Sequence, residues 1–188
     1  MIRLRPYKAC DAQYIVKWIK NEQEFRLWSA DRYDKFPIDA DKMNEHYDSY
    51  KDNDSFWPMT AFDENGVVGH LIMRFTDKNK MTVRFGFVIV DDSLRGKGYG
   101  YEMLHLAIKY AFEILKVNKI TLGVFERNKI AIKCYKEVGF KEVLHEEKHY
   151  HMLNQDWNCI EMEIQGTQNK VYENLIQLYK NFQPNIKM

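Results

Sequence analysis

The chain has 188 residues, 45% of them hydrophobic and 29% charged, which suits one folded domain and is too apolar for a disordered protein. Its 28 basic and 27 acidic side chains nearly cancel, so no bulk field draws it to nucleic acid or to an anionic membrane. No run approaches the roughly 18 apolar residues of a membrane span, and no apolar signal segment opens the chain. Three cysteines that are far apart in sequence, Cys10, Cys134 and Cys159, indicate reduced thiols in a cytoplasmic protein.

The first third of the chain predicts a strand, a helix and an aromatic-rich segment. Residues 2–5 alternate between charged and apolar, as a strand does. One helical face is formed by Tyr14, Ile15, Trp18 and Ile19. Residues 21–54 are polar with scattered aromatics, and a short helix is expected to begin near Asp39.

The middle of the chain predicts a hairpin and a third strand. Residues 57–62 and 67–75 are apolar runs separated by Asp-Glu-Asn-Gly, and Asn-Gly supplies the positive φ angles of a tight turn. A second turn leads into a strand at 81–90. A long amphipathic helix follows from about Gly98 to Leu115.

The last third predicts a strand at 119–125, a helix at 129–138 that Gly139 ends, and strands at 140–144 and 158–164. A strand, a long helix and another strand form a right-handed crossover, so the strands on either side of the long helix should be parallel. The predicted class is therefore α/β, with a mixed, mostly antiparallel sheet, a central parallel βαβ unit and flanking helices.

The expected domain covers residues 1–166, and residues 167–188 are expected to form a C-terminal helical extension. An apolar stripe runs along residues 168–182 at helical spacing. This helix should cover an apolar surface of its own domain or join a second copy, so a homodimer is possible.

Residues 95–100, Arg-Gly-Lys-Gly-Tyr-Gly, lie between a strand and the long helix, where an anion can bind. Free N–H groups and the positive end of the dipole at a helix N-terminus favour an anion, and glycines let the backbone approach it. A nucleotide P-loop needs a hydroxyl residue after its lysine, but Lys97 is followed by Gly98. A dinucleotide fingerprint needs G-x-G-x-x-G, whereas these glycines are evenly spaced. Both nucleotide classes are disfavoured.

Two segments resemble the GNAT superfamily of N-acetyltransferases. Residues 95–100 match Q/R-x-x-G-x-G/A, and residues 128–140 match N-x-x-A-x-x-x-Y-x-x-x-G-F. The order of elements from Ile2 to about Ile164 agrees, and the opening segment is most similar to the branch with ribosomal-protein N-terminal, polyamine and some aminoglycoside acetyltransferases. The resemblance implies the GNAT fold and direct transfer of the acetyl group of acetyl-CoA to a primary amine in a ternary complex, without a metal.

The resemblance also implies roles for individual residues. The strand residues would bond the pantetheine arm in a gap between two splayed strands, the loop would hold the pyrophosphate, and an asparagine would bond the arm. These cofactor-binding residues are Val88, Ile89, Val90, Arg95, Gly96, Lys97, Gly98, Tyr99, Gly100 and Asn128. Tyr135 would be the general acid that protonates the leaving thiolate, although alone it would be read as a core aromatic.

The sequence offers no general base that matches a family motif as Tyr135, the expected general acid, does. Many relatives carry a Glu at the strand position that here is Arg84 or at the one that here is Gly123. Glu126 and Asp91 are the nearest acidic residues in sequence, but a surface role is favoured for both, and a structural role is favoured for His70. The base stays unassigned, and a water relay is one possibility.

The acceptor is expected to be a small amine or a protein N-terminus, bound by residues 21–57 and 145–157. Acidic residues among aromatics would suit a cation, namely Glu22, Glu24, Asp31 and Asp34 among Phe25, Trp28, Tyr33 and Phe36. For most of them packing of the aromatics and solvation of the acids is favoured. His145, His149 and His151 are interpreted as surface residues. The alternative to an enzyme is a catalytically weak domain that senses acyl-CoA.

Overall fold

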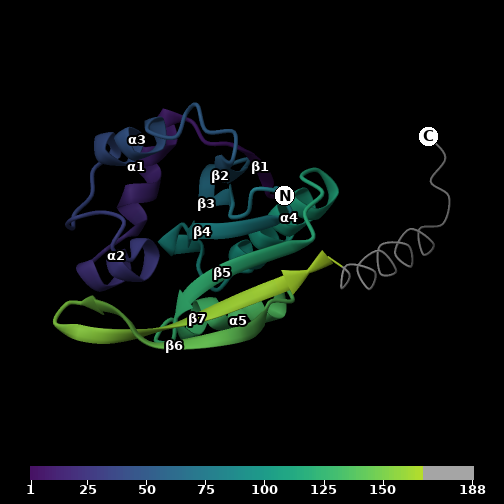
Figure 1. Cartoon of the computed structure of the whole chain (residues 1–188). Helices are drawn as coiled ribbons and strands as arrows, with labels where there is room; N and C mark the ends of the chain where they lie inside the picture. Colours follow the sequence, from purple (N-terminus) through teal and green to yellow (C-terminus); the bar gives the residue numbers. More distant parts are fainter. Residues whose placement is uncertain (167–188) are drawn as a thin grey trace.

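The structure, a computed structural model, describes residues 1–166, and the predicted helix at 168–182 lies outside them. One seven-stranded sheet has helices on both faces (Figure 1). Its strands are β1 (Arg3–Pro6), β2 (Phe56–Asp63), β3 (Gly66–Phe75), β4 (Thr82–Val90), β5 (Lys119–Phe125), β6 (Lys141–Met152) and β7 (Gln155–Gln165). The α-helices are α1 (Ala12–Ile15), α2 (Glu22–Ser29), α3 (Ala40–Asp48), α4 (Tyr99–Glu113) and α5 (Lys129–Glu137).

Within residues 1–166 the strand order is β1-β2-β3-β4-β5-β7-β6, and only the β4–β5 pair is parallel. The predicted mixed sheet with one parallel crossover is therefore confirmed. The β2–β3 hairpin turns where it was predicted, and Gly66 has the positive φ of 127° that this turn requires. α4 begins at Tyr99 and ends at Glu113, close to its predicted limits.

Alternate residues of the strands belong to two different cores. In β3, Leu71 and Met73 pack into the core under α4 and α5, whereas Ile72 packs on the opposite face under the three N-terminal helices. Figure 1 shows α1, α2 and α3 gathered together on that side of the molecule. β3 is thus buried on both faces along most of its length, whereas β5 carries the half-buried Thr121 and the exposed Gly123 on the face opposite the main core.

The N-terminal helical layer differs from its prediction in two ways. The expected first helix is a short α1 between two 3₁₀ turns, Ala9–Asp11 and Val16–Trp18. The helix α2 was not predicted, although Asn21 caps it by accepting a hydrogen bond from the Glu24 N–H at 2.8 Å. The helix near Asp39 is confirmed as α3.

The aromatic residues of this layer are mainly a core, as the packing interpretation expected. Those that are buried in it are Trp18, Phe25, Tyr33, Tyr47 and Phe56, with Tyr7, Trp28, Phe36 and Phe87 partly buried beside them. Three of the four acidic residues form ion pairs with neighbouring arginines: Glu22 with Arg26, Glu24 with Arg95 and Asp31 with Arg32.

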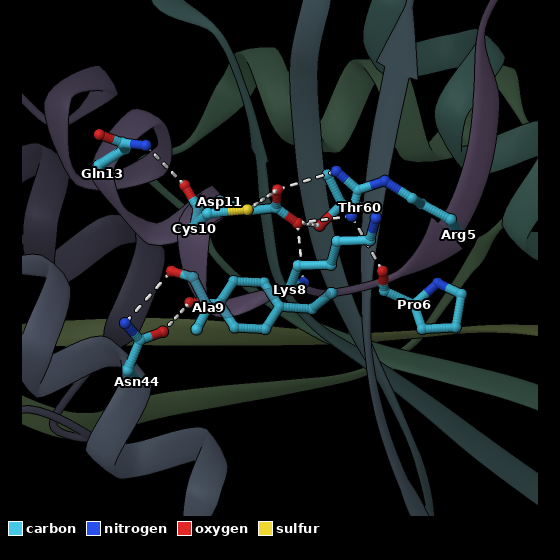
Figure 2. Close-up of polar contacts among 10 residues, drawn as sticks. Arg5, Pro6, Lys8, Ala9, Cys10, Asp11, Gln13, Asn44 and Thr60 are labelled. Atoms are coloured by element: carbon cyan, nitrogen blue, oxygen red, sulfur yellow. Dashed lines mark hydrogen bonds and ion pairs between the residues drawn. The ribbon is translucent and has the colours of Figure 1, made fainter.

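Asp11 fastens the first helical turn to the sheet (Figure 2). Its buried carboxylate accepts two hydrogen bonds from Arg5 of β1 at 2.7 and 2.8 Å, one from the Lys8 N–H at 2.9 Å and one from the Thr60 hydroxyl of β2 at 2.8 Å. Burial works to raise the pKa of Asp11, but these hydrogen bonds lower it overall. Asp11 is therefore ionised and fully satisfied in the folded protein.

The last two strands form a long hairpin that extends beneath α2 (Figure 1). β6 runs to Met152, eight residues beyond its predicted end. The predicted strand was too short because the side chains of β6 are nearly all exposed and show no clear alternation. The far end packs on α2, where Leu27 and the C-cap residue Ala30 contact a small core. The members of this core are Phe125, Met152 and Trp157.

Candidate active site

The sheet is split at its centre. β4 and β5 pair only through Thr82–Arg84 and Lys119–Thr121, and beyond this seam β4 continues along β3 while β5 continues along β7. The register between β3 and β4 shifts in the same region, and Phe87 has a positive φ of 49°, so a bulge bends β4 away. Val88–Val90, predicted to bind the cofactor, lie on the stretch of β4 that does not pair with β5.

The glycine loop predicted to bind an anion follows this stretch. Gly96 and Gly98 have φ angles of 75° and 87°, which side-chain-bearing residues rarely adopt. Gly98 is the N-cap of α4 and has no side chain to occupy the N–H groups of the first turn. These groups and the helix dipole can therefore receive an anion.

The side chains of the loop do not all face this anion site. Arg95 donates hydrogen bonds to the Trp18 carbonyl at 2.9 Å and to the Glu24 carboxylate at 3.3 Å, so its guanidinium is bound to the N-terminal layer. The Tyr99 hydroxyl donates to Asp63 at 3.1 Å. Lys97 is exposed, with no ion pair among residues 1–166. Lys97 and the backbone are thus the groups of the loop that are open to a phosphate.

Tyr135 lies in α5 with its ring against Phe140, the centroids 6.0 Å apart. Burial raises the pKa of its phenol well above the usual value of 10, so the phenol stays protonated at neutral pH. Within the described part of the chain, no group forms a hydrogen bond with its hydroxyl. The phenolic proton is therefore not committed to any other group of residues 1–166.

Asn128 is the N-cap of α5. Its side-chain oxygen accepts a hydrogen bond from the Ala131 N–H at 3.2 Å. This bond leaves both side-chain N–H groups of Asn128 and one lone pair of its oxygen for the role predicted for it. α5 ends at Glu137, and Gly139 has a φ of 103° just beyond it, as predicted for the glycine that ends this helix.

The three residues that were weighed as bases have other partners. His70 is fully buried, its Nε2 is 2.6 Å from the Tyr47 hydroxyl, and burial lowers its pKa to about 3. Asp91 accepts hydrogen bonds from the N–H and hydroxyl of Ser93. Glu126 accepts one from Asn158 at 2.9 Å and lies on the surface. Their favoured interpretations as structural and surface groups agree with these positions.

A carboxylate that sequence reasoning missed lies beside the split. Arg84 of β4 donates two hydrogen bonds to Glu161 of β7, at 2.5 and 2.6 Å, across Gly123 of β5. A Cβ atom at Gly123 would lie 2.5 Å from the Arg84 Nη2 and 2.8 Å from the Glu161 Oε1. The glycine is what lets this ion pair cross β5.

Comparison with known proteins adds the family. The model of the GNAT acetyltransferase family matches residues 16–140, about two thirds of the chain. The chain belongs to the GNAT acetyltransferase family. GNAT enzymes take the acetyl group from acetyl-CoA, so the predicted class, an acetyl-CoA-dependent N-acetyltransferase, and the predicted GNAT fold are both confirmed.

Several proteins similar to this GNAT acetyltransferase are themselves named acetyltransferases. Spermidine N(1)-acetyltransferase of Escherichia coli K12 is 26% identical over 149 residues, which cover 77% of each chain. Acetyltransferase PseH of Campylobacter jejuni is 26% identical over 163 residues, 85% of this chain and 97% of PseH. The structure of spermidine N-acetyltransferase from Vibrio cholerae in complex with CoA and spermine has a TM-score of 0.77 at 22% identity, over 88% of this chain and 96% of that one, and shows the same fold.

Two further expectations from the sequence concern the histidines of β6 and membrane-spanning segments. His145, His149 and His151 are exposed on the edge strand β6, in agreement with their interpretation as surface residues. No helix within residues 1–166 is both long and apolar enough to cross a membrane.

Proposed function

We propose that this GNAT acetyltransferase transfers the acetyl group of acetyl-CoA to a primary amine of a polyamine such as spermidine. The observation that carries the proposal is the split of β4 from β5, which ends at the glycine loop before α4. The polyamine is suggested by the names of the relatives in Escherichia coli and Vibrio cholerae. Protein N-termini and aminoglycosides remain alternative acceptors.

The cofactor is proposed to bind along the split. The stretch Val88–Val90 has no neighbouring strand on the β5 side, so its backbone groups can bond the amides of a pantetheine arm as a further strand would. The loop amides of residues 96–100 and Lys97 are proposed to hold the pyrophosphate. Asn128 is proposed to donate a hydrogen bond to the arm. Arg95 contributes by holding the loop against the N-terminal layer.

Tyr135 is the proposed general acid. The amine nitrogen attacks the thioester carbonyl, the carbon–sulfur bond breaks, and the thiolate takes the phenolic proton of Tyr135. An ammonium acceptor loses two protons in forming the amide. One restores the phenol, and the other is released to solvent. The reaction therefore consumes no further reactant.

Thiol release from acetyl-CoA tests the proposal directly. The purified full chain is incubated with acetyl-CoA and, in separate reactions, with spermidine, a peptide with a free N-terminus and an aminoglycoside. We expect release that depends on the amine and is highest with spermidine. CoA binding without release by any amine would instead support the sensor alternative. Faster turnover of the peptide or the aminoglycoside would contradict the polyamine.

A further inference from the structure

The acceptor amine of this reaction is positively charged at neutral pH and must lose a proton before it can react. A primary alkyl amine has a pKa near that of the lysine side chain, about 10.4, so it arrives as an ammonium ion. Its nitrogen can attack only after a proton has left. A carboxylate close to the split would both attract the ammonium and accept that proton.

Glu161 is a carboxylate that lies on the opposite face of the sheet from Tyr135. The neighbours of Glu161 in β7, Ile160 and Met162, point into the core that also contains Tyr135. Because side chains alternate along a strand, Glu161 projects from the other face. An amine that approaches from the Glu161 face would meet a proton acceptor, and a thiolate that leaves on the Tyr135 face would meet a proton donor.

Arg84 binds the Glu161 carboxylate but leaves part of its hydrogen-bonding capacity free. The bidentate pair uses two of the roughly four acceptor positions of a carboxylate, which leaves room for an ammonium N–H. The side chains of Arg84 and Glu161 are 26% and 22% exposed, so a ligand can reach them. Arg84 is itself at the last paired position of β4, where the seam with β5 ends.

Other ionisable groups also surround the pair. Arg74 of β3 is paired in register with Arg84, and Cys159 of β7 and Tyr150 of β6 interact electrostatically with Arg84. Glu146 of β6 brings a second carboxylate within 4.8 Å of the Glu161 carboxylate and the Cys159 thiol. Arg74 also attracts the Glu161 carboxylate, and the His149 Nδ1 lies 3.4 Å from the Glu146 carboxylate, so the two carboxylates lie among two guanidiniums and an imidazole. Of this group, Glu161 is the carboxylate that Arg84 holds beside the split, where it can attract an ammonium.

We propose that Glu161 binds the ammonium group of the acceptor at the split and accepts one proton from its nitrogen, while Arg84 is a positioning residue that fixes Glu161 across Gly123. The step converts the ammonium and the carboxylate into a neutral amine and a carboxylic acid, which returns its proton to water. The inference rests on the proposed acetyl transfer to an amine.

Glu161→Gln tests the inference, with Glu163→Gln as its matched control. Glu163 is on the same strand and the same face, but it lies opposite Thr121 in the closed part of the sheet and pairs with Lys119. We expect Glu161→Gln to lower kcat/KM for spermidine by about 10²-fold or more, with the KM for acetyl-CoA unchanged. Because more of the amine is already deprotonated at higher pH, the deficit of Glu161→Gln should shrink as the pH rises toward the amine pKa of about 10.4, whereas Glu163→Gln should follow wild type across the profile.

Gly123→Ala is a second variant that removes no charge. Its added methyl group must displace the ends of the Arg84 and Glu161 side chains, which are flexible, so the melting temperature should change little while kcat/KM for the amine falls. Equal amine kinetics and pH profiles for wild type, Glu161→Gln and Gly123→Ala would overturn the inference and leave acetyl transfer standing. A wild-type protein that acetylates no amine would overturn both.

Discussion

Gly98→Asp should abolish the stabilisation that CoA gives the protein. Gly98 has a φ of 87° and no atom lies within 4 Å of a Cβ built on it, so a side chain fits without collision. The added cost is the left-handed backbone conformation, about 1 kcal/mol. The carboxylate, however, stands at the N-terminus of α4 and repels a pyrophosphate there. Gly98→Asn has nearly the same shape and backbone cost without the charge.

The size of the effect can be worked out. A ligand at 100 times its Kd stabilises the native state by about 2.7 kcal/mol. In a chain of 188 residues, each kcal/mol shifts the melting temperature by about 2–4 °C, so CoA should raise it by about 5–10 °C. Both variants should melt about 2–4 °C below wild type without ligand. With CoA, Gly98→Asn should recover most of the shift and Gly98→Asp almost none.

Thermal denaturation of wild type and both variants, with and without CoA, measures all of these values. Equal shifts in the three proteins would show that the pyrophosphate does not bind at the α4 N-terminus. Equal loss in Asn and Asp variants would show that the backbone conformation, and not the charge, is what matters at this position.

Three further predictions concern single side chains. Tyr135→Phe should lower the single-turnover rate by about 10²- to 10⁴-fold without changing acetyl-CoA affinity, and equal rates from pH 6 to 9 would assign the acid elsewhere. His70, with its pKa lowered to about 3, takes up a proton on unfolding below about pH 6.5, so acid lowers the stability of wild type. Between pH 8 and 5, wild type should therefore lose about 2 kcal/mol more than His70→Gln in urea denaturation, at about 1.4 kcal/mol per pH unit below pH 6.5; parallel losses would mean that His70 is protonated in the fold. Asp11→Asn leaves Arg5 without its carboxylate and should cost about 3–5 kcal/mol of unfolding free energy, whereas a loss under 1 kcal/mol would show that the network is dispensable.

The sequence predicted the elements whose burial is one-sided. α4 buries six residues on one face, and its limits were placed within two residues. α2 buries only Phe25 and Ser29 in a short, mostly polar segment, so it offers few apolar residues to mark a helix and it was missed. β6 was cut short for a related reason, since an edge strand can be held by backbone pairing with β7 while its side chains stay in water.

The candidate site also has parts that the sequence predicts and parts that it does not. The glycine loop and Tyr135 were found because local spacing specifies a strand, a tight loop and a helix face. The pairing of Arg84 with Glu161 depends on three strands that come together only in the fold, and no pattern within one segment reveals it. The position of the Arg95 side chain, turned to the Trp18 carbonyl, likewise follows from tertiary contact.

A sheet that opens at its centre has two inner edges besides its outer ones. Unpaired strand edges invite other chains to pair with them, and proteins usually cover or charge them. Here the free stretch of β4 beyond the seam has six residues and that of β5 has four, because β4 ends at Val90 and β5 at Phe125. The outer edge at β6 is instead long and rich in charged side chains. The protein thus keeps both inner edges short and internal, where a slender ligand fits more readily than a strand of another protein.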